Sequence, residues 1–444
     1  MKVLKFGGTS VGSAQRMREV AELTHAPGER RIVVLSAMSG TTNTLVSIAG
    51  LLHTADVAAA TARIDIMRQE YLMVTRELLP DTTLAAAASK DLDTVFRTLF
   101  DLTRQPLSAA GERVILAQGE LLSCCLFHHY LTGVLGREAV LLPALEFMRL
   151  DANDEPDAAH IREHLQAQLA RHEGQRLFIT QGYICRNAHG KTDNLKRGGS
   201  DYSASLIGEA ADATEIQIWT DIDGLHNNDP RVVQGTYAIR ELSFDEAAEL
   251  AYFGAKILHP SSILPAARHG IPVRLLNTLQ PDAPGTLISN QTGTEPIKAI
   301  AAKDGLVAIN IKSSRMLLAH GFLRSVFEVF ERHRTSIDMI TTSEVAVSLT
   351  IDDATHLSRI LEELRHFGTV EVDRDQTIIC LVGNLIQETN GAARLIFDAL
   401  ADVPLRMISY GGSPNNISLL VHSADKARAL KALNAGLFQR NLTS

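Results

Sequence analysis

A lysine and two glycines near the amino terminus have the types and spacing of a phosphate-binding loop. Lys5 is followed by Gly7 and Gly8 in the segment MKVLKFGGTSVG. Adjacent glycines let a polyanion approach main-chain N–H groups, and a lysine ammonium can follow a transferring phosphoryl group. The loop matches neither G-x-x-x-x-G-K-[ST] nor G-x-G-x-x-G. A strand that ends in a tight turn with an exposed lysine is an equally good interpretation.

A second glycine pair precedes a helical segment in Arg197-Gly198-Gly199-Ser200-Asp201. Glycines at a helix amino terminus favour an anion site, and Arg197 can grip a carboxylate through two parallel hydrogen bonds. Asp201 is then available for an ammonium group, for a metal-bound water or to orient the catalytic lysine. Simple capping of the helix by Asp201 is the alternative.

Polar residues in two further segments are candidates for substrate contacts. Ser36 and Thr42 lie in SAMSGTTN, between a strand and a helix, where hydroxyl capping of that helix is the favoured interpretation. Glu120 lies on an apolar helix that would bury its carboxylate without a partner. That cost predicts a cationic ligand or an arginine nearby, unless Glu120 is simply exposed at the surface.

A long polar turn follows the apolar segment EIQIWT and suits a nucleotide base and ribose. Arg231 in this turn could reach a phosphate, and Lys256 adds another ammonium where a later helix breaks. A plain surface turn is about as good an interpretation. The candidates in these segments are Thr220, Asp221, His226, Arg231, Lys256 and Ile257.

These residues need a scaffold that brings distant segments together. Between residues 30 and 296, short apolar runs alternate with helical segments. The runs at 31–37, 177–184, 215–223 and 272–277 predict strands of a mostly parallel α/β sheet. Ligands of open α/β sheets bind beyond the carboxyl ends of the strands, where the candidate loops lie. Residues 54–131 are helical throughout and predict an insertion or lid.

A change in composition at residues 280–296 predicts a domain boundary. Beyond it, two repeats of about 70 residues each fit a ferredoxin-like βαββαβ unit. The second repeat is one strand short, and residues 298–303 are expected to complete it. We therefore expect an α/β domain at 1–290, a first small module at 297–375 and a second at 376–444.

Composition excludes several classes of protein. The net charge of −8 without a Lys/Arg stripe argues against a nucleic-acid partner. No apolar run approaches the roughly 18 residues of a membrane span, so we expect a cytoplasmic protein without a membrane partner. The four cysteines show no C-x-x-C spacing, which predicts core thiols and no protein-bound metal.

Eight motifs in order resemble those of the aspartate kinases, members of the amino-acid kinase family. They are KFGGTSVG, SAMSGTTN, GEL, TQGY, KRGGSDYSA, WTDIDG, NDPR and FGAKILHP. The C-terminal repeats resemble the tandem ACT regulatory modules of the monofunctional, lysine-sensitive type. The resemblance covers essentially the whole chain. It implies a carbamate-kinase-like α/β sheet sandwiched by helices, followed by two ACT modules.

The activity implied by the resemblance is transfer of the γ-phosphoryl group of ATP to the side-chain carboxylate of L-aspartate. The product is 4-phospho-L-aspartate, the first step toward lysine, threonine and methionine. ATP and Mg²⁺ are the implied cofactors, and Lys5 and Asp201 the implied catalytic residues. Substrate binding falls to Ser36, Thr42, Glu120, Arg197, Gly198, Gly199 and Ser200. Nucleotide binding falls to Lys5, Gly7, Gly8, Thr220, Asp221, His226, Arg231, Lys256 and Ile257.

The resemblance extends to regulation. Inhibition by L-lysine and a homodimer formed through the ACT modules are expected. Asp338 could hold the ε-ammonium of lysine, or it could equally be a charge on a strand edge that limits aggregation. Ala319 replaces a serine often found in this pattern, which leaves lysine and threonine open as effectors. The matching positions are Met316, Gly321, Phe322, Leu323, Asp338, Thr342, Ser343 and Glu344.

Two other functions fit parts of the sequence. A kinase of glutamate or N-acetylglutamate is disfavoured by the paired ACT-like repeat and by Glu120 together with Arg197. A catalytically silent amino-acid sensor or scaffold is disfavoured by the presence of Lys5, Arg197 and Asp201. We expect no fused homoserine dehydrogenase, because the chain carries no G-x-G-x-x-G motif and stops after the second module.

Overall fold

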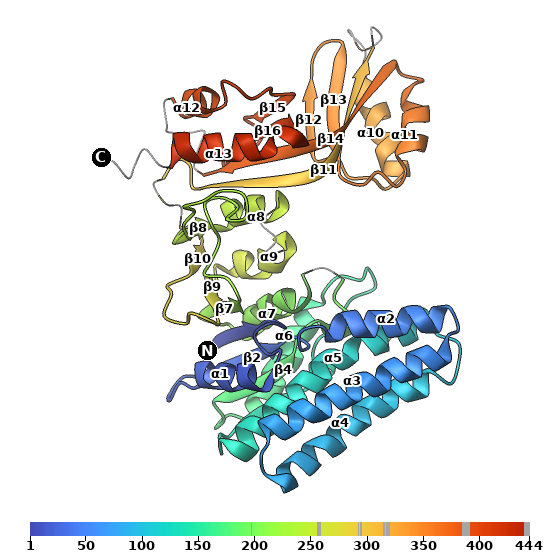
Figure 1. The fold of residues 1–444 in the computed structure, drawn as a ribbon, viewed down its shortest axis with the longest axis vertical. Coiled ribbons are helices and arrows are strands. Elements are labelled where there is room, and N and C mark those ends of the chain that lie inside the picture. Colours follow the sequence, from blue (N-terminus) through green and yellow to red (C-terminus); the bar gives the residue numbers. More distant parts are fainter. Residues whose placement is uncertain are drawn as a thin grey trace. The chain divides into compact units, whose positions relative to one another are not determined.

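The computed structural model describes residues 1–196, 198–254, 259–291, 293, 295–313, 316, 320–383 and 391–438. The chain divides into two compact units, whose elements are labelled in Figure 1. The first unit comprises Met1–Leu225, Arg240–Phe244 and Leu258–Gln291. The second comprises His226–Ile239, Asp245–Ile257 and Thr292–Ser444.

An eight-stranded sheet in the order β3-β4-β2-β1-β7-β9-β10-β8 forms the centre of the first unit. The strands from β3 through β9 are parallel, β10 is antiparallel to β9, and β8 is parallel to β10. The mostly parallel sheet predicted from the sequence is therefore confirmed. The strands are β1 (Lys2–Phe6), β2 (Arg31–Leu35), β3 (Val140–Leu142), β4 (Leu177–Gln181), β7 (Glu215–Thr220), β8 (Glu241–Ser243), β9 (Val273–Asn277) and β10 (Thr286–Ser289), beside a separate hairpin of β5 (Ile184–Arg186) and β6 (Thr192–Asn194).

The central strand β1 fixes the edge of the sheet at which ligands are expected. Its apolar residues Val3, Leu4 and Phe6 are fully buried. It pairs in parallel with β2 on one side and β7 on the other, so that Lys5 lies opposite Val34 and Ile218. The carboxyl ends of these three strands therefore meet at one edge of the sheet.

Helices cover the sheet and build the predicted helical insertion. Figure 1 shows α2, α3, α4 and α5 side by side, and apolar residues of these helices share a core that includes Ile64, Phe96 and Phe127. The helices of this unit are α1 (Ala14–Thr24), α2 (Thr41–His53), α3 (Val57–Leu78), α4 (Thr82–Leu102), α5 (Ala109–His129), α6 (Ala158–Arg171), α7 (Gly199–Ala210) and α9 (Pro260–His269). None of the helices in the described part of the chain is long and apolar enough to cross a membrane.

The second unit contains one six-stranded antiparallel sheet in the order β12-β13-β11-β14-β16-β15. Its strands are β11 (Ala299–Lys312), β12 (Met339–Thr342), β13 (Ala346–Ile351), β14 (Thr369–Val382), β15 (Met407–Tyr410) and β16 (Asn416–His422). Its helices are α8 (Phe244–Tyr252, which begins in the first unit), α10 (Phe322–Arg332), α11 (Leu357–Leu364), α12 (Ala392–Ala399) and α13 (Lys426–Leu437).

Both repeats use the long strands β11 and β14. The second half of β11 pairs with β13 and packs over one apolar core, which contains Ile309 and Val329. The first half of β11 runs beside 378–382 of β14, over another core that contains Ile300 and Leu381. The two repeats are thus parts of one continuous sheet, and residues 299–303 lie beside the second repeat.

Candidate functional site

The loops after β1 and β2 approach each other closely at the carboxyl edge of the sheet. A Cβ atom added to Gly8 would lie 2.8 Å from the carbonyl oxygen of Ala37, so glycine is the residue that fits there. The Ser39 N–H donates to the Gly8 carbonyl at 3.1 Å, and the Ser36 N–H donates to the Phe6 carbonyl at 3.1 Å. The two loops therefore form one polar surface.

Lys5 and Asp201 are brought together at this surface. The Lys5 Nζ atom lies 2.6 Å from Asp201 Oδ1, and the two side chains are only 11% and 17% exposed. Lys5 is on β1 and Asp201 is in the first turn of α7, which packs against β1. A Cβ atom at Gly7 would lie 3.5 Å from Lys5 Nζ, so the ammonium sits beside the glycine loop. An ammonium has three N–H donors, so Lys5 can donate to a phosphate while it stays paired in charge with Asp201.

The helices α2 and α7 begin with left-handed glycines rather than with capping side chains. Gly40 (φ 84°) precedes α2 and Gly198 (φ 67°) precedes α7, and no side chain in the described part of the chain caps either helix. The hydroxyl capping of α2 favoured by the sequence, and the alternative in which Asp201 caps α7, are both wrong. Uncapped N–H groups at a helix amino terminus favour an anion.

Glu120 places a carboxylate inside the first unit, beside the loop after β2. It is 5% exposed, so the alternative of a surface position is wrong. Its Oε1 atom accepts a hydrogen bond from the Ala37 N–H at 3.2 Å. Burial raises the pKa of Glu120 to about 7, although the Ala37 hydrogen bond and the charge of Lys5 oppose the shift. A cation bound beside Glu120 would return it to the ionised form.

The other substrate candidates lie in the same loops and first turns. Ser36 is half-buried after β2, and its carbonyl accepts a hydrogen bond from Ser123 Oγ at 2.8 Å. Thr42 is exposed in the first turn of α2. Ser200 is nearly buried in the first turn of α7, next to Gly199 (φ 49°). Arg197 lies outside the described residues.

Sequence reasoning missed two supporting residues. A Cβ atom at Gly182, after β4, would lie 2.5 Å from the Cβ of Ser200, so this glycine makes room for the start of α7. Ser123 ties α5 to the Ser36 carbonyl one turn after Glu120. The TQGY motif contains Gly182 and could have signalled its role, whereas nothing in the sequence around Ser123 marks it.

The nucleotide candidates are divided between the units. Thr220 ends β7, beside β1 in the first unit, and its Oγ1 donates to Asp221 Oδ1 at 3.1 Å. His226 and Arg231 belong to the second unit. The His226 Nδ1 atom lies 2.9 Å from Thr236 Oγ1. Arg231 forms a two-pronged pair with its near neighbour, Asp229, at 2.9 and 2.8 Å. Lys256 and Ile257 lie outside the described residues.

The regulatory candidates lie on α10 and around β12. Gly321 (φ 86°) precedes α10, and Phe322 and Leu323 begin it. Thr342, Ser343 and Glu344 are exposed at the hairpin between β12 and β13, and Met316 packs against the core of the first repeat.

Asp338 precedes β12, an edge strand of the sheet, but its side chain is 0% exposed and pairs with Lys303 Nζ at 2.7 Å. Asp338 is thus next to a strand edge, but its carboxylate faces Lys303 and not the solvent.

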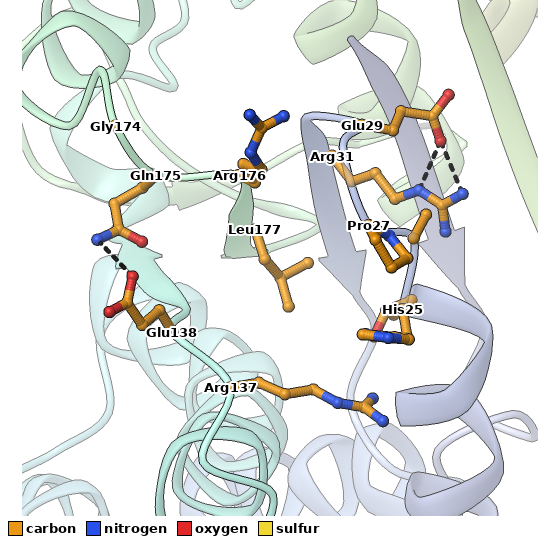
Figure 2. Close-up of a pocket in the computed structure, with 12 residues that line it drawn as sticks. His25, Pro27, Glu29, Arg31, Arg137, Glu138, Gly174, Gln175, Arg176 and Leu177 are labelled. Carbon is orange, nitrogen blue, oxygen red and sulfur yellow. Dashed lines mark hydrogen bonds and ion pairs between the residues drawn. The ribbon is translucent and has the colours of Figure 1, made fainter.

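A cavity of about 340 Å³ lies at the opposite edge of the large sheet. Figure 2 shows it beside the amino-terminal ends of β2 and β4, lined by Arg31, Arg137 and Arg176 among others. The Arg31 guanidinium is held by Glu29 at 2.7 Å, as the dashed lines mark. This cavity is separate from the candidate site, since it lies at the other ends of the strands.

Metal-ligating side chains do not gather beside Lys5 in the described part of the chain. The one group of three possible ligands found there consists of Asp91 on α4 and Cys125 and His129 on α5. His129 Nε2 lies 2.8 Å from Asp91 Oδ2, so these two side chains already satisfy one another.

Comparison with known families agrees with this arrangement. A model described as the amino acid kinase family matches residues 1–277, and a model of the ACT domain matches residues 379–437.

Individual relatives are similar over the whole chain. Lysine-sensitive aspartokinase 3 of Escherichia coli (strain K12) is 35% identical over 449 residues, which cover 98% of this chain and 99% of that protein. A crystal structure of E. coli aspartokinase III with aspartate and ADP (R-state) has a TM-score of 0.81 at 34% identity, over 99% of this chain and 100% of that one. The structure with lysine and aspartate (T-state) has a TM-score of 0.80 at 34% identity, over 99% of both chains.

Proposed function

Since the chain belongs to the amino acid kinase family and, within it, to the aspartokinases, we propose that it is an aspartate kinase. It transfers the γ-phosphoryl group of ATP to the side-chain carboxylate of L-aspartate, giving 4-phospho-L-aspartate, the first step toward lysine, threonine and methionine. The observation that carries this proposal is the pair of Lys5 and Asp201, 2.6 Å apart at the uncapped amino terminus of α7.

In this reaction the protein mainly positions the two substrates and stabilises the charge on the transferring phosphoryl group. The side-chain carboxyl of aspartate has a pKa near 4, so it is already ionised at neutral pH and needs no general base. One of its oxygens forms a bond to the γ-phosphorus while the bond to the ADP oxygen breaks. Lys5 and the N–H groups of Gly7 and Gly8 stabilise the charge on the transferring group, and Asp201 orients Lys5.

The remaining residues divide between the two substrates. Glu120 pairs with the ammonium group of aspartate, and Arg197 grips a carboxylate. The aspartate site further includes Ser36, Thr42, Gly198, Gly199 and Ser200. The nucleotide site includes Thr220, Asp221, His226, Arg231, Lys256 and Ile257 besides the Lys5 loop.

Magnesium fits this site as an ion bound mainly by the nucleotide. No cage of three protein ligands lies at the Lys5 edge in the described residues, and Mg²⁺ commonly binds through substrate phosphates with one or two carboxylates. Asp201 is the carboxylate that would hold it, through water. When bound, the ion neutralises phosphate charge.

The experiment that tests the proposal compares Lys5→Ala with Lys2→Ala in a coupled assay of ADP release. Lys2 is on the same strand but pairs with Glu29 at the other end, where it is 31% exposed. We expect Lys5→Ala to lower kcat about 10³-fold while the protein still folds, and Lys2→Ala to keep normal kcat. Near-normal turnover in Lys5→Ala would remove the central assignment.

The same assay decides between acceptors. Aspartate, glutamate and N-acetylglutamate are supplied separately, and turnover is expected with aspartate alone. Preference for glutamate or N-acetylglutamate would make the chain a different amino-acid kinase. No turnover with any of them would favour the silent sensor instead.

The proposal includes regulation by the second unit. The catalytic domain spans 1–290, the ACT modules span 297–375 and 376–444, and L-lysine inhibits through the first module. Exposed apolar residues on α10, α12 and β15, namely Leu323, Phe327, Leu395, Phe397, Ile408 and Tyr410, support a homodimer through these modules. Assays with lysine and threonine added separately identify the effector. A cytoplasmic location, where ATP and free aspartate occur together, completes the proposal.

A further inference from the structure

Asp338 lies in a compact cluster of charged and aromatic side chains in the second unit. Its Oδ1 atom accepts a hydrogen bond from Lys303 Nζ at 2.7 Å and another from the Tyr252 hydroxyl at 2.8 Å. The same ammonium of Lys303 also pairs with Asp352 at 2.7 Å. One ammonium is therefore held between two carboxylates.

The surroundings of this ammonium are those of an amine receptor. Lys303 Nζ lies 4.6 Å from the centre of the Tyr252 ring, within the range of a cation–π contact. The side chain of Asp338 is 0% exposed, and that of Lys303 is 19% exposed. Two carboxylates and an aromatic face around an alkylammonium are the features that would recognise the ε-ammonium of a free lysine.

Only one of the two carboxylate oxygens of Asp338 accepts hydrogen bonds from the described residues. Its Oδ2 atom is buried and has no hydrogen-bond partner among the described residues. A buried acceptor without a donor is costly, and burial raises the pKa of Asp338 against the influence of Lys303. A second donor arriving at Asp338 would therefore be favourable, and it would share or take the carboxylate from Lys303.

We propose that Lys303 is a built-in competitor of the amine effector, occupying Asp338 in the effector-free protein so that an incoming ammonium must displace it. This inference rests on the regulation proposed above and adds what sets the sensitivity to the effector. The apparent dissociation constant of a ligand that has to displace an internal group is the intrinsic constant divided by the fraction of time that the site is free.

Replacement of the Lys303 ammonium at Asp338 by that of the effector would change the contacts of α8. Tyr252, the last residue of α8, holds Asp338, while Glu246 near the start of α8 pairs with Lys298 at 2.7 Å in a fully buried contact. Gly254 passes so close to β11 that a Cβ atom would lie 2.2 Å from the Ala302 carbonyl oxygen. α8 is thus attached near its start to Lys298, which directly precedes β11, and the chain just after its end contacts β11 itself. Displacement of Lys303 changes only the Tyr252 end. α8 directly follows β8 of the large sheet. A change in the contacts of α8 can therefore be transmitted through the chain to β8.

The test measures lysine inhibition of aspartate phosphorylation in the full chain. Lys303→Met removes the competing ammonium and keeps the length of the side chain, so we expect the lysine concentration for half-inhibition to fall about tenfold. Lys303→Gln is a second variant. It also removes the competing ammonium while both carboxylates stay in place, and should lower that concentration as well.

Lys312→Met is the matched control. Lys312 lies on the same strand and pairs with Glu371 at 2.8 Å, but both side chains are about half exposed. Its half-inhibition value should equal that of the wild type. Lys303→Arg, which keeps the charge, should also stay near the wild-type value.

The outcomes separate this inference from the proposed function. If the wild type does not phosphorylate aspartate, the proposed function fails. If the wild type is active and lysine inhibits it, but both variants are inhibited at an unchanged or higher concentration, the inference fails alone. A wild type indifferent to lysine whose Lys303→Met variant becomes sensitive would support the inference. Indifference of both would overturn it.

Discussion

The charge of Glu120 depends on what binds beside it. Its carboxylate is buried, accepts one hydrogen bond from Ala37 and has a pKa of about 7. The group is therefore divided between its charged and neutral forms at neutral pH. The ammonium group of a bound amino acid would favour the charged form.

Glu120→Gln should reveal this shift as a pH-dependent stability difference. A carboxyl whose folded pKa is raised from 4.5 stabilises the fold fully below pH 4.5 and loses that contribution as pH rises through about 7. Glutamine does not titrate and can still accept from Ala37. The variant should thus gain stability relative to the wild type between pH 5 and pH 8, on the order of 2 kcal/mol. Urea unfolding of the ligand-free protein measures it, and a constant difference would contradict the assigned burial.

The affinity for aspartate should increase as Glu120 ionises, whereas the stability of the ligand-free protein decreases. Aspartate needs the ionised form of Glu120, so its KM in the wild type should fall as pH rises from 6 to 8. In Glu120→Gln the KM should be higher at pH 8 and nearly independent of pH over this range. Initial-rate measurements at saturating ATP check this, and parallel pH profiles of the two proteins would argue against an ammonium contact at Glu120.

The sequence indicated which residues form the site, but it did not indicate which of them contact one another. Lys5, Gly8 and Asp201 could be selected because two glycine pairs with charged neighbours recur in motifs that, in this order, resemble those of one family. The pair between Lys5 and Asp201 joins segments almost 200 residues apart, and no local pattern specifies it. Arg231 illustrates the opposite case, since its partner Asp229 is two residues away and satisfies it locally.

At the scale of elements, close backbone contacts position the site. Gly8→Ala would place a methyl group 2.8 Å from the Ala37 carbonyl and force the loops after β1 and β2 apart. We expect at least a tenfold loss of kcat/KM and a destabilisation of about 1 to 3 kcal/mol, as in overpacked cores.

Gly50→Ala is the matched control within α2. Nothing lies within 4 Å of a Cβ atom at that position, so alanine should stabilise the helix by roughly 0.5 to 1 kcal/mol without changing activity. Thermal unfolding and initial rates of both variants provide the measurement. Normal activity in Gly8→Ala would show that the two loops need not touch.

Apolar periodicity predicted most elements because buried strands and amphipathic helices leave strong patterns. The helix starts were less predictable. Gly40 and Gly198 take the N-cap positions that hydroxyls or Asp201 would have filled, because left-handed backbone at these turns favours glycine. The sequence also suggested separate strands where β11 and β14 each run through 14 residues. The register shift near Gly305 interrupts the pattern without ending the strand.

At the scale of the whole molecule, the shared sheet should make the second unit unfold as one body. Ile309→Ala in the core of the first repeat and Leu381→Ala in that of the second should each cost about 2 to 5 kcal/mol. Both should reduce amide hydrogen-exchange protection in both repeats, because β11 and β14 cross from one core to the other.

Arg324→Ala is the control for this experiment. Its side chain is 83% exposed on α10 and pairs with Glu328 along the helix, so protection should not change measurably. Loss of protection confined to the repeat that carries the substitution would show that the repeats open independently. The division of the chain into repeats was predictable from their similarity, whereas their fusion depends on strand pairing over about 70 residues of sequence.

The two strands that belong to both repeats limit how such a regulatory unit can evolve. A gene that kept the first repeat and lost the elements after β14 would leave residues 376–382 of β14 without β16, exposing an unpaired sheet edge. Recombination that exchanges sensory parts among these enzymes is therefore expected to move both repeats as a single inherited block. New ligand preferences would then arise by point substitution inside that block.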